Sequence, residues 1–425
     1  MKRFLLFQAL ALAWIFVVAG QDFNAFFTDA TLRLDYVFSG NAARQEISLD
    51  ELCREPRWYG KRQRLAEVPV EGNGQVTVRD HHSGEVIYRH SFSTLFQEWL
   101  ATPEARQVSR SFQNVFLVPM PKDTVDVTVS LTGSRRQVMA TFTHQVAPSD
   151  ILIRQVGYDH VTPFTTVQQA ADTTRCIHIA FIAEGYQQGE MGTFRADVDT
   201  AVQAIFAHEP FRSMRSRFNV VAVEAPSMDS GTSEPGAGRW KNTALGSAFN
   251  TFYSDRYLTT LRLKRLHDLL AGTPYEHIVV LVNCNTYGGG GILNSYNLTS
   301  THHQHYKPVV VHEFGHSFAG LADEYAYASE ESDQYWTDIE PWERNITTLA
   351  DFHGKWEKLI DTKTPIPTPL NPAKPQQIGL YEGAGYKMKG VYRPFQDCRM
   401  RTNSNPEFCA VCRRAILQVI DFYTR

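Results

Sequence analysis

Cysteine is scarce in this chain, and so is an excess of charge of either sign. Only 6 of the 425 residues are cysteine, too few for a fold held together mainly by disulfide bridges. The 42 basic side chains nearly balance the 45 acidic ones, so no overall field would attract nucleic acid or an anionic membrane. With 43% apolar residues and ordinary glycine and proline content, the composition predicts a globular protein of two or three domains.

Long hydrophobic runs are also missing, except at the N-terminus. Lys2 and Arg3 precede an apolar stretch over residues 4–18, and small residues follow up to Gly20. A positive end, a short apolar core and a small-residue exit predict a signal peptide at 1–20. The alternative is an uncleaved anchor, but an apolar run of about 15 residues is shorter than the roughly 20 that span a bilayer. We therefore expect a secreted or periplasmic mature protein without a membrane span.

The first half of the remaining chain alternates apolar and polar residues with a period of two. This alternation is typical of strands with one buried face, and turn-forming residues such as Gly72, Gly84 and Gly133 separate the stretches. The pattern predicts an N-terminal antiparallel β-sandwich over residues 21–150. The clearest predicted strands are 32–38, 75–79, 124–129 and 137–142.

The second half alternates between predicted strands and helices. Near Asp150 the pattern changes to the strand–helix order of a layered α/β domain, which we place at 151–425. The predicted fold class is therefore α+β or α/β, with a mixed twisted sheet in the second domain. The change of pattern also predicts that this second half folds without the first. The predicted strands are 176–183, 218–225 and 277–282, and the predicted helices are 194–206 and 258–270.

A short motif carries the most specific chemistry. His312 and His316 flank Glu313 in the order His-Glu-x-x-His, directly after three valines. On a helix the two histidines project from one face, as two ligands of one zinc ion require, and the glutamate can reach a water molecule at the metal. The motif predicts a zinc hydrolase in which Glu313 is the general base.

The third zinc ligand should follow a turn. Gly320 can end the helix in a left-handed conformation, and Asp323 comes three residues later. Glu324 is one residue further along and has a longer side chain, so it is the alternative ligand. A catalytic zinc site needs three protein ligands and an open position, and either carboxylate could complete it.

This segment resembles the metzincin pattern His-Glu-x-x-His-x-x-Gly-x-x-His, with two departures. The glycine comes one residue later, and an aspartate stands where metzincins have the third histidine. Metzincins also place a methionine in a tight turn beneath the metal, and the resemblance implies this role for Met400. In such enzymes an exposed edge strand upstream of the zinc helix holds extended peptide. The resemblance implies substrate binding by Gly289, Gly290 and Gly291, the alternative being a surface loop.

Longer stretches resemble one family more closely. The segment from His312 to Tyr325, together with motifs at 182–186, 340–347, 381–385 and 393–400, is similar to the IgA-peptidase family of secreted bacterial metallopeptidases. The β-rich first half resembles the N-terminal domain of some members. The resemblance implies a zinc-dependent endopeptidase with a protein or peptide substrate; it does not imply that this chain cleaves IgA.

Two other functions remain open. The chain could be a binding protein on a protease fold, or a zinc amidase that acts on cell-wall peptides; the intact Glu313 argues against the first.

The cysteines leave a further choice open. Cys398, Cys409 and Cys412 are close enough in sequence for a local disulfide, with free thiols as the alternative. A structural zinc site there would need a fourth ligand, and no histidine lies nearby.

Overall fold

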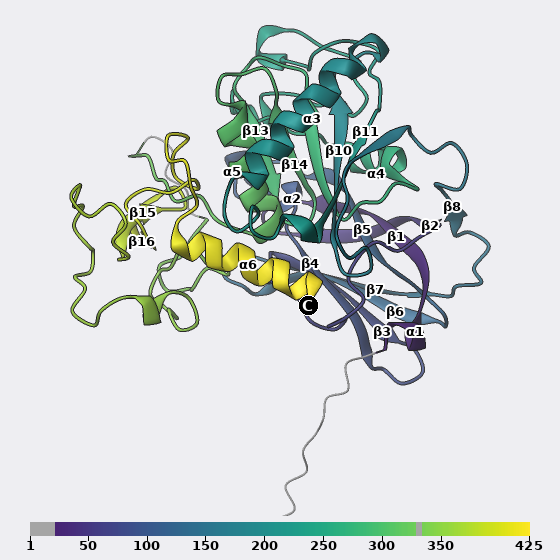
Figure 1. The fold of residues 1–425 in the computed structure, drawn as a ribbon. Helices are drawn as coiled ribbons and strands as arrows, with labels where there is room; N and C mark the ends of the chain where they lie inside the picture. The colour runs from purple at the N-terminus through teal and green to yellow at the C-terminus, as the bar shows by residue number, and fades with distance from the viewer. Residues whose placement is uncertain (1–21, 329–333) are drawn as a thin grey trace, which may run out of the picture.

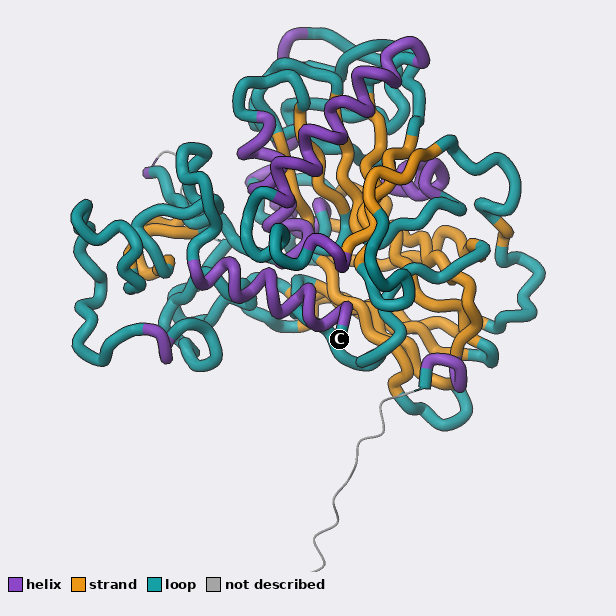
Figure 2. Tube along the Cα trace, viewed as in Figure 1, coloured by secondary structure: helices purple, strands orange, loops and turns teal. Residues whose placement is uncertain are grey.

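The computed structural model describes residues 22–328 and 334–425. The predicted signal peptide at 1–20 lies outside the described residues. Figures 1 and 2 show a β-rich N-terminal part beside a mixed sheet that carries most of the helices. A smaller C-terminal lobe holds a two-stranded sheet.

Two four-stranded sheets make up the N-terminal part. One has the order β5-β1-β2-β8 and is antiparallel except at its short last strand, and the other has the antiparallel order β4-β3-β6-β7. The strands of the first sheet are β1 at Phe27–Gly40, β2 at Gln45–Glu55, β5 at Arg110–Pro121 and β8 at Arg154–Gln155. Those of the second are β3 at Gly74–Asp80, β4 at Val86–Phe92, β6 at Val125–Thr132 and β7 at Val138–Val146.

The two sheets pack face to face through the apolar residues that the alternation predicts. Every second residue of β6 is buried, beginning at Val125. Across the interface the rings of Phe92 and Phe116 lie 4.1 Å apart, and the Tyr36 hydroxyl lies 2.7 Å from Nε2 of His144. The predicted N-terminal β domain is thus present as two packed sheets.

A six-stranded mixed sheet forms the centre of the second half. Its order is β13-β14-β12-β10-β11-β9; the inner strands are parallel, and each edge strand runs antiparallel to its neighbour. All residues of β10 and β12 are buried, as expected for parallel strands covered on both faces. The strands are β9 at Phe164–Gln168, β10 at Ile177–Glu184, β11 at Phe218–Val223, β12 at His277–Val282, β13 at Gly289–Ile292 and β14 at Tyr296–Ser300.

Helices cover one face of this sheet and the β-sandwich packs on the other. Ile179 and Phe181 of β10 belong to the cluster formed with the helices. Ala180 and Ile182, which point the opposite way, belong to a cluster that continues into the sandwich. The helices of the first cluster are α3 at Met191–Phe206, α5 at Tyr306–Ala319 and α6 at Ala410–Thr424.

A buried ion pair also joins the two halves. The Arg33 guanidinium, fully buried in β1, donates to both carboxylate oxygens of Asp35 at 2.7 Å. It also donates to Asp268 at 2.7 Å, and Asp268 belongs to α4 at Leu263–Leu270 in the second half. This contact and the shared core argue against the expectation that the second half folds alone, because separation would expose an apolar sheet face.

One predicted helix is shorter than expected. The leucine spacing predicts a helix over 258–270, but α4 begins only at Leu263. Thr259 is instead extended and pairs with Ala248 through hydrogen bonds of 3.0 and 3.2 Å. Two adjacent threonines, Thr259 and Thr260, favour this extended backbone because their branched side chains lose rotamer freedom in a helix. Local pairing therefore overrides the leucine spacing.

Shorter elements complete the described chain. None of the described helices is long and apolar enough to cross a membrane. The C-terminal lobe contains β15 at Tyr381–Ala384 paired with β16 at Lys387–Arg393, and the short N-terminal helices are α1 at Phe23–Phe26 and α2 at Leu95–Leu100.

The shared core gives a direct prediction for truncated chains. Residues 151–425 expressed alone should be recovered mainly as aggregate, because the sheet face that packs on the sandwich would be exposed. Co-expression of 22–150 as a separate chain should return soluble protein in which the two pieces purify together. A soluble 151–425 fragment with a sharp thermal transition would contradict this account.

Candidate active site

The helix α5 presents the two motif histidines on one face. It packs against β13 and β14, which form one edge of the six-stranded sheet. Gly320 ends the helix in the left-handed conformation, with φ of 59°, and its N–H donates to the His316 carbonyl at 2.9 Å. The chain then reverses direction, as the glycine predicts, and returns toward the histidines.

Three side chains converge after this reversal. Nε2 of His312 lies 3.0 Å from Nε2 of His316 and 3.0 Å from Oδ1 of Asp323. Nε2 of His316 lies 3.3 Å from the same oxygen. Each of the three side chains is only 13–15% exposed, which leaves an opening to solvent beside otherwise buried groups. The structure thus brings together the two histidines and Asp323.

Backbone carbonyls fix the orientation of both imidazoles. Nδ1 of His312 lies 3.0 Å from the Arg399 carbonyl, and Nδ1 of His316 lies 2.5 Å from the Leu321 carbonyl. Since a carbonyl only accepts, each Nδ1 must carry the proton in the neutral ring, and each Nε2 presents its lone pair to the shared centre. Carbonyl contacts of this kind orient histidine ligands in metal sites.

The site fits a cation. Oδ1 of Asp323 is buried and accepts no hydrogen bond among the described residues, although it faces both Nε2 atoms. Burial opposes a charged His316, but the Asp323 carboxylate outweighs this effect and raises the pKa of His316 to about 9. A buried place that favours positive charge, with two nitrogens and one oxygen around it, suits a metal such as zinc.

Glu313 lies between the helix and the edge strand. A methyl group added at Gly289 would stand 2.8 Å from Glu313 Oε1, so the carboxylate packs directly on β13. Desolvation raises the pKa of Glu313, and the imidazoles of His312 and His316 oppose that rise. The Glu313 carboxylate therefore lies near His312, His316 and Asp323 but is not part of their cluster.

The glycines of β13 allow this close packing of strand and helix. A Cβ at Gly291 would come within 2.3 Å of the Glu313 carbonyl, and one at Gly290 within 2.9 Å of the Tyr257 ring. On the outer edge Gly289 pairs with Tyr257, whose hydroxyl donates to Glu98 of α2. The proposed pairing of Gly289, Gly290 and Gly291 with substrate stays a prediction. At Gly289 the substrate backbone would compete with Tyr257, which already pairs with this residue.

Met400 lies beneath the motif helix. It is fully buried, and a Cβ at Gly315 would stand 2.7 Å from its sulfur. The preceding residue, Arg399, supplies the carbonyl that holds His312. The Met-turn role that the metzincin resemblance implies for Met400 stays a prediction.

Glu324, the alternative third ligand, points away from the histidines. Its carboxylate accepts from the Cys412 thiol and from the Asn345 amide, both at 3.0 Å. All six cysteines are free thiols, the second of the two alternatives that the sequence left open. Adjacent residues of an extended segment face opposite sides, which separates the Asp323 and Glu324 side chains.

Two tyrosines near the site carry weaker sequence signals. The Tyr386 and Tyr325 hydroxyls lie 2.7 Å apart, and the Tyr325 ring is stacked 6.4 Å from that of His312. Burial, with the adjacent Asp323 carboxylate, raises the pKa of Tyr386 well above its usual value. A third tyrosine, Tyr392, pairs through its backbone with Thr347. The carbonyls of Leu321 and Arg399 carry no side-chain signal and could not be foreseen.

Comparison with known families agrees with the site and with the N-terminal part. The family model described as IgA Peptidase M64 matches residues 165–374 and 370–420, together more than half of the chain. A second model, described as Peptidase M64 N-terminus, matches residues 22–143. No curated protein is significantly similar to this chain in sequence.

The tight contact between β13 and α5 predicts the effect of one added methyl group. Gly291→Ala should lower stability by about 1–3 kcal/mol, because the new Cβ meets backbone that cannot move aside freely. Gly189→Ala is the matched control, since no atom lies within 4 Å of its added Cβ. Chemical denaturation measures both. Equal midpoints for Gly291→Ala and Gly189→Ala would mean that the contact is loose.

Proposed function

Because the chain belongs to the IgA peptidase M64 family of metallopeptidases, we propose that it is a secreted zinc endopeptidase. The observation that carries this proposal is the convergence of His312, His316 and Asp323 on one centre, with Glu313 beside it. The N-terminal pattern of residues 1–20 supports export. We place the chain in the periplasm or outside the cell.

The two imidazoles and the Asp323 carboxylate would hold the zinc ion. When bound, zinc would act as a Lewis acid that polarises the substrate carbonyl and makes a water molecule more acidic. Three protein ligands would leave room for a water molecule at the ion. One carboxylate among the ligands leaves a net charge of about +1, lower than the +2 of three neutral histidines.

Glu313 would move the proton. Its carboxylate accepts a proton from the attacking water and then donates it to the leaving amine, so one residue serves as base and as acid. Packing against β13 fixes the carboxylate in place, which keeps the proton-transfer distance short. The lower charge of the two-histidine, one-aspartate site places more of the proton removal on Glu313.

Tyr386 is the residue best placed to stabilise the developing oxyanion. Its hydroxyl lies next to Tyr325 and the Asp323 carboxylate, whereas Tyr392 lies in β16 and pairs with Thr347. A hydroxyl that donates to the oxyanion lowers the barrier without taking part in binding the metal. Tyr386→Phe should therefore lower kcat more than it raises KM.

A peptide library tests the function as a whole. The full mature chain is incubated with a diverse set of peptides, with and without a chelator, and the products are identified by mass spectrometry. We expect cleavage at internal bonds that the chelator abolishes and added zinc restores. Cleavage restricted to cell-wall peptides would instead identify an amidase, and no cleavage of any substrate would favour a binding protein.

Replacement of the general base should separate catalysis from metal binding. Glu313→Gln keeps the shape of the side chain but cannot accept the proton, so kcat/KM should fall by at least about 10²-fold while zinc stays bound. Glu46→Gln, on the exposed surface of β2, is the control and should behave as wild type. Activity above about a tenth of wild type in the Glu313 variant would exclude this role.

Loss of the third ligand should weaken the metal itself. Asp323→Ala should lower zinc affinity at this site by a factor of about 10 or more, since even losses outside the ligands cost about 10–100-fold. Chelator competition measures the affinity, and Asp338→Ala, whose side chain is 64% exposed, is the control. Unchanged affinity in the Asp323 variant would mean that another group completes the site.

A further inference from the structure

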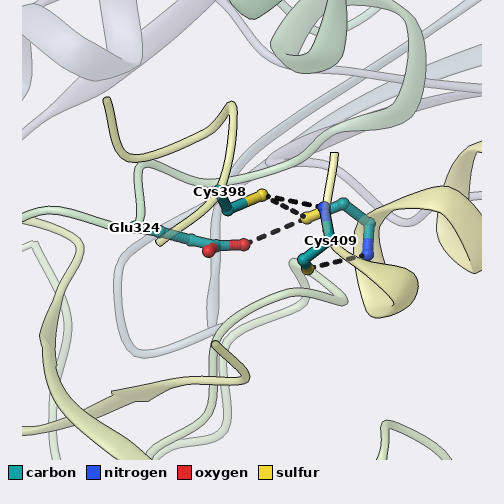
Figure 3. A group of neighbouring side chains, drawn as sticks. Glu324, Cys398 and Cys409 are labelled. Atoms are coloured by element: carbon teal, nitrogen blue, oxygen red, sulfur yellow. Dashed lines mark hydrogen bonds between the residues drawn. The ribbon is translucent and has the colours of Figure 1, made fainter. Parts of the chain in front are cut away.

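A second cluster of side chains that can bind a metal ion includes Glu324, the residue after Asp323. Three thiols and one carboxylate come together from three separate segments of the chain, and their ligand atoms all lie within 4.8 Å of one another. Every member is at most 5% exposed. Figure 3 shows the Glu324 carboxylate pointing into the group from the segment that follows α5. We propose a second, structural zinc site whose four ligands are Glu324, Cys398, Cys409 and Cys412.

Two of the three sulfurs have the spacing of ligands in a tetrahedral zinc site. Sγ of Cys398 and Sγ of Cys412 lie 3.8 Å apart. Two thiolates bound to one zinc at about 2.3 Å are separated by about 3.8 Å at the tetrahedral angle. Cys409 and Cys412 are spaced as Cys-x-x-Cys, a separation common in structural zinc sites. Soft thiolate ligands favour zinc over magnesium or calcium.

The backbone around the cluster is arranged to stabilise thiolates. The N–H of Cys409 donates to Sγ of Cys398 at 3.2 Å, and the N–H of Cys412 donates to Sγ of Cys409 at 3.4 Å. Cys409 also caps the N-terminus of α6, where the helix dipole favours negative charge. These N–H groups could support negative sulfur while leaving the ligand lone pairs free.

Glu324 supplies the fourth ligand that the sequence alone does not show. The side chain is fully buried, and Oε2 has no hydrogen-bond partner among the described residues. Oε1 accepts hydrogen bonds from Asn345 and Cys412, and these two bonds orient the carboxylate. Oε2 accepts none from the described residues. An unsatisfied buried carboxylate oxygen costs free energy, and a bound cation removes that cost.

Two buried arginines balance the charge of the occupied site. Three thiolates and one carboxylate carry four negative charges, and a zinc ion offsets two of them. Arg393 interacts electrostatically with Glu324, and Arg399 with Cys398; each arginine is only 5% exposed. Their two positive charges would offset the remaining two, so the site as a whole can be buried.

The second ion would hold the first site together. Glu324 is adjacent to Asp323, and its N–H donates to the Met400 carbonyl at 2.8 Å. Cys398 directly precedes Arg399, the residue whose carbonyl orients His312. A zinc ion bound to Cys398 and Glu324 therefore fixes the two segments that supply an aspartate and a carbonyl to the active site. We expect its loss to weaken zinc binding at the active site as well.

The sharpest test isolates the second site in the full chain. The double variant His312→Ala/His316→Ala, purified from zinc-replete medium, should retain one zinc per chain where wild type has two, as measured by mass spectrometry of the metal. X-ray absorption at the zinc edge of this variant should show sulfur ligands at about 2.3 Å. Adding Cys398→Ser to the variant should remove the remaining zinc, while adding Cys284→Ser as the control should not.

Several results would overturn the proposal. A double variant free of zinc would do so, as would a remaining zinc surrounded only by nitrogen and oxygen. A disulfide within the cluster, detected by peptide mapping without reductant, would show that oxidation and not metal satisfies these thiols. Because the double variant lacks the active-site histidines, these results are independent of whether the chain cleaves peptides. If Cys398→Ser prevents folding, the absorption spectrum of the double variant still decides the question.

Discussion

The rest of the site depends on one constraint: the backbone must reverse direction after α5 so that the Asp323 carboxylate faces the imidazoles of His312 and His316. Gly320 turns the chain back, and the carbonyl of the next residue, Leu321, fixes the His316 ring. The Arg399 carbonyl does the same for His312 from a segment far along the sequence. The geometry of three side chains is thus set by backbone atoms of two segments.

The β-sandwich contributes to this geometry from a distance. It packs on the sheet face opposite α5, and the two parts share one hydrophobic core. It also contacts the edge of the sheet near Glu313, because Glu98 of α2 accepts a hydrogen bond from Tyr257, which pairs with Gly289. A catalytic domain that lacks the sandwich would lose both supports. The N-terminal part and the peptidase part therefore share one core.

Local patterns in the sequence predicted the secondary-structure elements well, and contacts between distant segments less well. The motif from His312 to Asp323 could be interpreted because helix periodicity and a glycine turn fix the positions of nearby residues. The helix predicted over 258–270 was too long because Thr259 pairs with Ala248, which the leucine spacing does not show. The carboxylate that lies beside the cysteines, that of Glu324, is more than seventy residues before Cys398 in the chain. Only the folded chain brings these two together.

Anomalous X-ray scattering from crystals of the mature chain, recorded at the zinc edge, tests the central claim most directly. The account predicts a peak within bonding distance of Nε2 of His312, Nε2 of His316 and Oδ1 of Asp323, with Glu313 close by but not bound to the metal. A crystal grown with zinc that shows no peak at this centre would contradict the account. So would a peak bound to Glu313 in place of Asp323, because that carboxylate could not then serve as the general base.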